Sequence, residues 1–216
     1  MTDADIEALR RAAEHPVTAT LADLDAVADD LSAAFQDDPQ FRWFMRDDHR
    51  ADLARLNLFK LMVAGSGIPD GIVSRPVSGG AAAIWLPSES MTPSSLMQEL
   101  RILPTILAAT GFRRFGRMMA MRETMEKYHP KDRPHAYLWF LGVRPEAQGF
   151  GVGSRLLAAG LRDVDAQGRH AYLESSNVAN VPLYQRHGFE VVAEFAPGPG
   201  GPPFYAMWRQ AGRAAK

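Results

Sequence analysis

A glycine-rich turn between two apolar segments is the part of the sequence best suited to chemistry. It follows the apolar run 136–143 and precedes leucines that recur on one face of an expected helix. Backbone N–H groups at a helix N-terminus gather anions, and glycines let a ligand approach that backbone closely. We therefore expect a diphosphate to bind at the main chain of Gln148, Gly149, Phe150, Gly151, Val152, Gly153 and Ser154.

The spacing of these glycines excludes the two commonest phosphate-binding loops. A dinucleotide fingerprint, G-x-G-x-x-G, would end on Ser154 when counted from Gly149 and on Leu156 when counted from Gly151. A P-loop ends in Gly-Lys-Ser/Thr, and this segment has no lysine. The remaining pattern is Gln-x-x-Gly-x-Gly. On the glycines alone, a strand–helix turn without any ligand stays open as the alternative.

Two further features favour a bound ligand over a bare turn. Gly142 interrupts a strand of bulky apolar residues, which suggests a bulge or the close approach of another backbone-like chain. Downstream, Tyr184 lies in a short expected helix between two expected strands. The chain thus offers an anion-binding turn and, after it, a phenol that can take part in proton transfer.

Taken together, these residues resemble the GNAT superfamily of N-acetyltransferases. The acetyl-CoA motif of that family, Arg/Gln-x-x-Gly-x-Gly/Ala, reads here as Gln148, Gly151 and Gly153. Its later block, Asn…Tyr-x-x-x-Gly-Phe, reads as Asn177, Tyr184, Gly188 and Phe189. The stretches 129–134 and 205–209, with the Glu-Ser-Ser after Leu173, are similar to puromycin N-acetyltransferase and its relatives. The resemblance covers about residues 129–210.

The resemblance implies an enzyme that moves an acetyl group from acetyl-CoA directly to the primary amine of a small molecule. The strand ending at Val143 would separate from its neighbour, and pantetheine would pair with the main chain of Leu141, Gly142 and Val143. An N–H group near Val143 would stabilise the oxyanion. Asn177 and Asn180 would bind pantetheine or, equally well, cap the helix that carries Tyr184.

The same resemblance suggests how protons would move. Tyr184 is the candidate acid for the departing thiolate, although a tyrosine that only packs the helix on the sheet is the alternative. Glu174 is one candidate base, because strand alternation directs it away from the face of Leu173. A Glu held for structural reasons, water from bulk, Asp37 or Asp38 are the alternatives for that base.

The acceptor pocket would come from the first half of the chain, where the resemblance is limited to the order of elements. Its expected aromatic walls are Phe41, Trp43, Phe44, Trp85, Tyr128 and Trp139. Met118, Met121 and Met125 form a helical stripe that belongs to the core or, second, to an adaptable substrate wall. Arg113, Arg114 and Arg117 indicate a solvated helix surface or, more weakly, a salt bridge to the 3′-phosphate of CoA.

Composition and charge exclude several classes of function and partner. With 24 Lys+Arg against 25 Asp+Glu, the net charge of -1 makes nucleic acid and acidic membranes poor partners. The chain has no Cys, which excludes an acetyl-thiol enzyme and favours direct transfer. Its 6 His lack metal-ligand spacing, so no metal is expected. No secretory signal is evident and the longest apolar run, 136–143, is far below the ~20 residues of a membrane span, so we expect a cytoplasmic protein.

The pattern predicts one mixed α/β domain with a mostly antiparallel sheet of about six to seven strands flanked by helices. Residues 1–15 are expected to form a helical extension of the acetyltransferase domain 16–216, which divides into a variable acceptor-side half, 16–128, and an acetyl-CoA-binding half, 129–210. The expected strands are 17–20, 72–77, 80–86, 136–143, 170–175, 189–195 and 204–208. The main expected helices are 4–14, 24–35, 50–63, 94–127 with breaks near Pro104 and Gly111, the one after the turn, and 178–186.

Three alternatives stay open at this point. The protein could be a non-catalytic acyl-CoA sensor that keeps the cofactor turn. It could instead acetylate a protein N-terminus or lysine, or use another acyl donor. Either a monomer or a homodimer is compatible with the sequence.

Overall fold

Seven strands form one mixed sheet in the computed structural model, which describes residues 2–91 and 95–212. Their order is β1-β2-β3-β4-β5-β7-β6, and β4 with β5 is the parallel pair among antiparallel ones. The predicted fold class is therefore confirmed. The strands are β1 Val17–Thr18, β2 Ile72–Arg75, β3 Ala81–Pro87, β4 His135–Val143, β5 His170–Ser175, β6 Glu190–Phe195 and β7 Phe204–Arg209.

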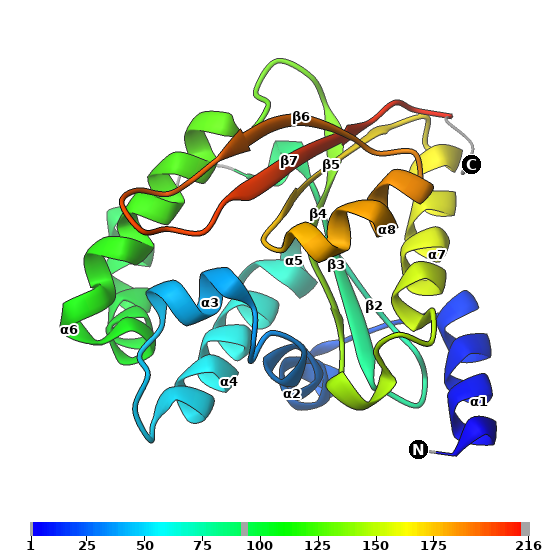
Figure 1. The fold of residues 1–216 in the computed structure, drawn as a ribbon, viewed down its shortest axis with the longest axis horizontal. Helices are drawn as coiled ribbons and strands as arrows, with labels where there is room; N and C mark the ends of the chain where they lie inside the picture. The colour runs from blue at the N-terminus through cyan, green and yellow to red at the C-terminus, as the bar shows by residue number, and fades with distance from the viewer. Residues whose placement is uncertain (1, 92–94, 213–216) are drawn as a thin grey trace.

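Helices cover both faces of this sheet (Figure 1). They are α1 Asp3–Glu14, α2 Leu24–Ala34, α3 Pro39–Phe44, α4 Ala51–Met62, α5 Ile68–Asp70, α6 Leu96–Tyr128, α7 Val152–Ala166 and α8 Val181–Arg186. Alternation along β3 divides the core: Ile84 and Leu86 pack toward α2 and α4, whereas Ala83 and Trp85 pack toward α1 and α7. Two apolar clusters, one on each face, thus hold the sheet.

Helix α1 belongs to the core rather than to a loose extension. Its Leu9 and Ala13 are buried in the cluster that also contains Leu156 of α7. Glu14 accepts hydrogen bonds at its carboxylate from Arg155 at 2.7 Å and at its backbone carbonyl from Arg162 at 2.6 Å. The N-terminal helix therefore packs against α7, the helix that begins at the glycine-rich turn (Figure 1).

A bulge in β4 and an early end to its pairing with β5 create the central irregularity of the sheet. The register of β3 on β4 passes from Ile84↔Phe140 to Trp85↔Leu138, so Trp139 is the extra residue. Trp139 and Phe140 consequently pack toward the same cluster although they are adjacent in sequence. Beyond Tyr137, β4 and β5 no longer pair.

Gly142 is not the site of the bulge in β4. It pairs regularly with Ala82. A Cβ atom at this position would lie 2.9 Å from Cβ of Ala34 and 2.9 Å from Cδ2 of Leu31. The glycine therefore allows α2 to pack directly against β4, and the bulge lies three residues earlier, at Trp139.

The structure differs from the sequence-based expectation mainly at segment ends. Helix α2 ends at Ala34, and Asp38 and Pro39 begin α3, because Asp38 caps that helix and Pro39 occupies its first turn. The helix expected to stop near Gly65 continues through a π-turn over Val63–Gly67 into α5. Helix α6 accommodates Pro104 and bends at Gly111, whose φ is 61°.

Within residues 2–91 and 95–212, none of the helices combines the length and the apolar character that crossing a bilayer requires.

The packing of Trp85 on α7 predicts the effect of one methyl group. At Gly160 an added Cβ would lie 2.3 Å from Nε1 of Trp85. Gly160→Ala should therefore lower the free energy of unfolding by about 1–3 kcal/mol, the usual cost of overpacking. Gly116→Ala, also in a helix but with open space around it, should raise that free energy by about 0.5–1 kcal/mol. Denaturant unfolding of both variants measures the contrast, and a stabilised Gly160→Ala protein would contradict this packing.

Candidate active site

The glycine-rich turn connects the end of β4 to the start of α7. After a 3₁₀ turn over Pro145–Ala147, Gly149 and Gly151 adopt φ values of 81° and 78°. Other residues pay about 1–2 kcal/mol for such a left-handed conformation, which accounts for glycine at both positions. Gly151 is the N-cap of α7, so the next three amides lack partners within the helix and are available to an anion.

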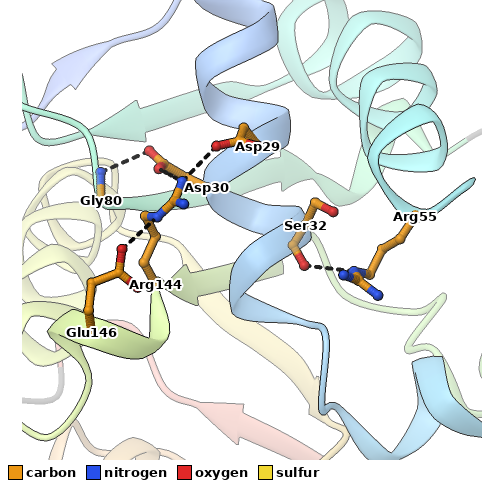
Figure 2. A network of polar contacts seen from close by, with 7 residues as sticks. All are labelled: Asp29, Asp30, Ser32, Arg55, Gly80, Arg144 and Glu146. Atoms are coloured by element: carbon orange, nitrogen blue, oxygen red, sulfur yellow. Dashed lines mark hydrogen bonds and ion pairs between the residues drawn. The ribbon is translucent and has the colours of Figure 1, made fainter. Parts of the chain in front are cut away.

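A charge network braces this turn from the side of β4 (Figure 2). The Arg144 guanidinium contacts Asp29 at 2.7 Å, Asp30 at 3.2 Å and Glu146 at 3.0 Å. Asp30 also accepts a hydrogen bond of 2.9 Å from the N–H of Gly80. Burial raises the pKa of Asp30 even though Arg144 and Gly80 oppose the shift. Because three carboxylates surround Arg144, this residue holds the turn in place and is not a phosphate ligand.

Helix α2, which carries Asp29 and Asp30, is fixed from its other side as well. The Nε atom of Arg55 in α4 donates to the carbonyl oxygen of Ser32 at 2.7 Å (Figure 2). Arg55 also contacts Asp52 at 2.9 Å. The helix that packs on Gly142 is therefore anchored both to α4 and to the start of the turn.

A cleft of about 500 Å³ lies against the turn. Every predicted turn residue except Phe150 lines it, and Phe150 is 47% exposed. Leu141, Gly142, Val143, Asn177 and Asn180 also line it. The structure thus brings the predicted cofactor residues together in one cleft.

Backbone groups of β4 point into this cleft. The N–H of Arg144 donates to the carbonyl of Gly80 at 3.0 Å, on the β3 side. Because backbone groups alternate along a strand, the N–H and C=O of Val143 and of Leu141 point the other way, into the gap left by β5. The Val143 carbonyl already accepts a hydrogen bond of 2.9 Å from the side chain of Gln148. Gln148 thereby closes the turn onto the strand end.

A second cavity, of about 770 Å³, lies on the other side of the strand gap. Its apolar wall comes from α3, α4, α6 and β4. Five residues line both hollows: Phe35, Asp38, Leu141, Asn180 and Tyr184. The two spaces therefore adjoin where β4 and β5 separate, with Tyr184 between them.

Comparison with known proteins agrees with this geometry. Residues 104–189 match the family model described as the Acetyltransferase (GNAT) family. These residues form an acetyltransferase domain of the GNAT superfamily. The resemblance inferred from Gln148, Gly151 and Gly153 is thereby confirmed at the superfamily level, whereas the likeness to puromycin N-acetyltransferase stays a prediction.

Curated relatives include two mycothiol acetyltransferases. The protein of Paenarthrobacter aurescens is 33% identical over 142 residues, which are 57% of this chain and 44% of that protein. The protein of Streptomyces avermitilis is 31% identical over 168 residues, which are 65% of this chain and 54% of that protein. The chain therefore spans about half the length of the curated relatives it matches.

Solved structures extend the comparison over nearly the whole chain. One from Corynebacterium glutamicum, described as histone acetyltransferase HPA2 and related acetyltransferase, has a TM-score of 0.68 and 26% identity, and covers 92% of this chain and 96% of that one. The polyamine N-acetyltransferase of Drosophila melanogaster has a TM-score of 0.60 with 13% identity, covering 90% of this chain and 99% of that one. The second likeness concerns the fold alone.

Within this GNAT domain, the predicted aromatic residues fall into two groups. Phe41, Phe44 and Trp139 line the larger cavity. Trp85 lies on the opposite face of the sheet, against Gly160, so it is not part of the larger cavity. Trp43 packs under the Arg117 guanidinium at 5.6 Å, outside both hollows.

Tyr128 also lies outside the larger cavity, because its ring stacks on Phe195 at 4.2 Å. Met118, Met121 and Met125 belong to the apolar cluster on this face, as their helical spacing predicted, and they also line that cavity. Further lining residues come from α4, where Leu58, Leu61 and Met62 carry no sequence signal beyond ordinary amphipathic spacing.

The arginine cluster of α6 binds the protein itself. Arg114 donates to the carbonyl oxygens of Arg42 and Met45, and Arg117 donates to that of Trp43 at 2.9 Å. These bonds tie α6 to α3. Arg114 and Arg117 are therefore unsuited to the 3′-phosphate of CoA.

Contacts and exposure also distinguish the two aspartates considered as the base, and they show which groups Asn177 binds. Asp38 is half-buried and its oxygens accept from the N–H groups of Gln40 and Phe41 and from Ser176, whereas Asp37 is 76% exposed at its side chain. Asn177 caps the 3₁₀ turn Val178–Asn180 by accepting from the N–H of Ala179 at 3.0 Å.

Sequence reasoning missed one polar partner of the turn. The Ser154 hydroxyl, in the first turn of α7, lies 2.8 Å from Nε2 of His187. Burial lowers the pKa of His187, so this imidazole is neutral at pH 7. In its hydrogen bond with Ser154, one of the two groups donates and the other accepts, depending on the tautomer of the ring. Among the described residues, no group of three or more His, Asp or Glu side chains is placed to hold a metal ion.

The two left-handed glycines that flank α7 provide a matched test of the turn. Gly151 lies at the cleft with φ 78°, and Gly168 lies beyond the far end of the helix with φ 63°. Alanine at either position incurs about 1–2 kcal/mol of strain. If the turn binds the diphosphate, Gly151→Ala should weaken CoA binding about tenfold, because strain of this size re-aims the amides.

Isothermal titration of CoA into both variants measures the effect. Gly168→Ala should bind CoA like the wild type while losing similar stability to heat. Equal CoA affinity in the two variants would mean that the turn is not the diphosphate site.

Proposed function

We propose that this chain is an acetyl-CoA-dependent N-acetyltransferase that transfers the acetyl group directly to the primary amine of a small molecule with an apolar body. The observation that carries the proposal is the meeting of two hollows at the gap between β4 and β5. One hollow offers unpaired backbone donors and the other offers apolar walls ending at a buried carboxylate. Membership of the GNAT family and the names of the mycothiol acetyltransferases support acetyl transfer.

The smaller cleft suits acetyl-CoA because its donors fit an amide-bearing chain that ends in a diphosphate. The first amides of α7 and the turn glycines would hold the diphosphate. The main chain of Leu141 and Val143, pointing into the strand gap, would pair with the pantetheine arm as a neighbouring strand does. The N–H of Val143 then lies where a thioester oxygen would gain negative charge during attack.

Tyr184 is the proposed partner of the departing sulfur. It lines both hollows and is 8% exposed. Burial, and then the charge of Asp38, raise the pKa of Tyr184 above its usual value. The phenol therefore keeps its proton at pH 7, but it is a weaker acid than an ordinary tyrosine. We infer that it stabilises the thiolate chiefly by donating a hydrogen bond, with full proton transfer coming after the bond to sulfur breaks.

The larger cavity suits the acceptor. Its wall of Phe41, Phe44, Met118 and Trp139 favours an aliphatic or aromatic body. Glu174 lines the same cavity, and its buried carboxylate would attract the ammonium group. The cavity volume of about 770 Å³ fits a small molecule. An acceptor that is both cationic and apolar matches these walls.

A screen of acceptors tests this function directly. Release of free thiol from acetyl-CoA would be followed with alkylamines, arylalkylamines, polyamines and short peptides with free N-termini. Transfer to the apolar amines is expected. CoA binding without transfer to any amine would indicate an acyl-CoA sensor instead, and transfer to the peptides alone would indicate a protein acceptor.

Removal of one hydroxyl tests the role of Tyr184. Tyr184→Phe should lower kcat by about 10–100-fold, because a donor to the leaving sulfur is lost. The KM for acetyl-CoA should stay close to that of the wild type. Tyr205→Phe, a similar change at a half-buried tyrosine of β7 that lines neither hollow, should have little effect. Unchanged kcat in Tyr184→Phe would remove this tyrosine from the mechanism.

Added volume tests the acceptor pocket. Met121 lines the cavity, whereas Met97 of the same helix is 80% exposed. Met121→Phe should raise KM for the bulkier of two apolar amines by about tenfold, since an overpacked site loses about 1–3 kcal/mol. The KM for acetyl-CoA should not change. Met97→Phe should match the wild type for both amines, and an unaltered KM in Met121→Phe would place the acceptor elsewhere.

A further inference from the structure

Glu174 is a buried carboxylate that lies next to the phenols of Tyr137 and Tyr172. Its side chain is 1% exposed, and neither oxygen has a hydrogen bond of ordinary length and angle to a described residue. A buried carboxylate in this state is costly unless something compensates it. The nearest ionisable group is His129, whose Nδ1 lies 3.5 Å from Oε1 of Glu174.

The hydrogen bonds of two histidines define where their protons are. Nδ1 of His135 lies 2.8 Å from the carbonyl oxygen of Arg133, which can only accept, so this nitrogen carries a proton. Burial lowers the pKa of His135 and keeps its ring neutral, which leaves Nε2 as an acceptor. Nε2 of His129 lies 3.1 Å from that acceptor and must therefore donate. Nδ1 of His129 is then the open proton-accepting position, and it faces Glu174.

Resting on the proposed function, we propose that His129 is a positioning and relay residue that takes from Glu174 the proton removed from the acceptor ammonium. The donor–acceptor order Glu174–His129–His135–Arg133 carbonyl gives the relay one direction. A proton on Nδ1 of His129 makes an imidazolium with both N–H groups partnered, one by the Glu174 carboxylate and one by His135.

The proton balance is complete without another reactant. The N–H bond of the ammonium breaks, and its electron pair stays on the nitrogen that attacks the thioester. The proton adds to a carboxylate oxygen of Glu174 and then passes to Nδ1 of His129. The His129 side chain is 11% exposed against 1% for Glu174, so the imidazole is the member of the pair that can release the proton to solvent water.

The surroundings hold the His129 ring in this orientation. Tyr137 of β4 and Tyr172 of β5 contact its faces edge-on, with ring centroids 4.9 Å and 5.0 Å away, and His135 lies at 5.0 Å. Burial, and then the charge of Glu174, raise the pKa of Tyr137 and of Tyr172, so both phenols stay neutral.

The remaining charged group near the relay is Arg169. It donates at 3.0 Å to the backbone carbonyl of His135 and at 2.5 Å to Glu89, so it is already engaged. The ionisable groups that face the His129 ring are therefore Glu174, His135, Tyr137 and Tyr172, of which Glu174 lines the cavity.

Two acceptors of different basicity test the relay. An alkylamine is an ammonium ion at pH 7, with a pKa of about 10, whereas an arylamine is already neutral and needs no base before attack. His129→Gln removes the titrating ring, and His129→Phe keeps its packing while removing both nitrogens. With the alkylamine, both variants should lose about 10–100-fold in kcat/KM at pH 7. With the arylamine, both should stay close to the wild type.

The pH dependence gives an independent readout. The loss with the alkylamine should shrink as the pH rises toward 10, because free amine then forms without the enzyme. Glu174→Gln should show the same selectivity with a larger loss, of about 10²–10⁴-fold. His170→Gln, on the same strand as Glu174 but outside the cavity, should show neither effect. CoA affinity, measured by calorimetry, checks that each variant is folded.

The outcomes separate the relay from the proposed function. If wild-type protein transfers acetyl to no amine, the proposed function fails and the relay fails with it. If wild-type protein is active but the His129 variants lose the two acceptors equally at every pH, His129 is merely structural and the relay alone is overturned. Full activity of both variants with the alkylamine also overturns it.

Discussion

Strands β4 and β5 pair over three residues and then separate, and the site depends on this separation. The bulge at Trp139 bends β4, and α2 packs against Gly142 further along the strand. Backbone groups that a neighbouring strand would normally satisfy are left facing a cleft. Since unpaired backbone groups require partners, the gap is a receptor for a chain-like ligand that carries amides, and the two hollows can exchange a group only through it.

The charged side chains around the site have two roles. Some hold the surrounding helices in place, and one is available to take up a proton. Arg144, Arg55 and Arg114 are each engaged by carboxylates or carbonyl oxygens and fix α2, α4 and α6 around the site. Glu174 is the contrasting case, since its buried carboxylate faces no arginine or lysine of the described chain and has His129 as its ion-pair partner at 3.5 Å. The arginine contacts keep the turn and the helices in place, while a carboxylate without such a cation retains its capacity to take a proton.

The sequence was sufficient for the fold class, most strands and the turn, because apolar runs and glycine spacing are local signals. It could not locate the bulge, since Trp139 differs in no local way from its neighbours and the extra residue is visible only from the β3 register. It also could not show where α1 packs, because the burial of this helix depends on α7 from a distant part of the chain. The side of the sheet that Trp85 occupies, and the contact of His129 with Glu174, likewise arise from pairings that no single segment encodes.

The distribution of the four tryptophans has a practical consequence. Trp85 is shielded behind the sheet, Trp43 lies under an arginine and Trp208 stacks near His170 and His135, whereas Trp139 lines the larger cavity. An occupant of that hollow therefore touches a single indole while the other three keep their environments. The protein consequently carries an intrinsic optical reporter, whose emission responds to filling of the chamber without any attached label.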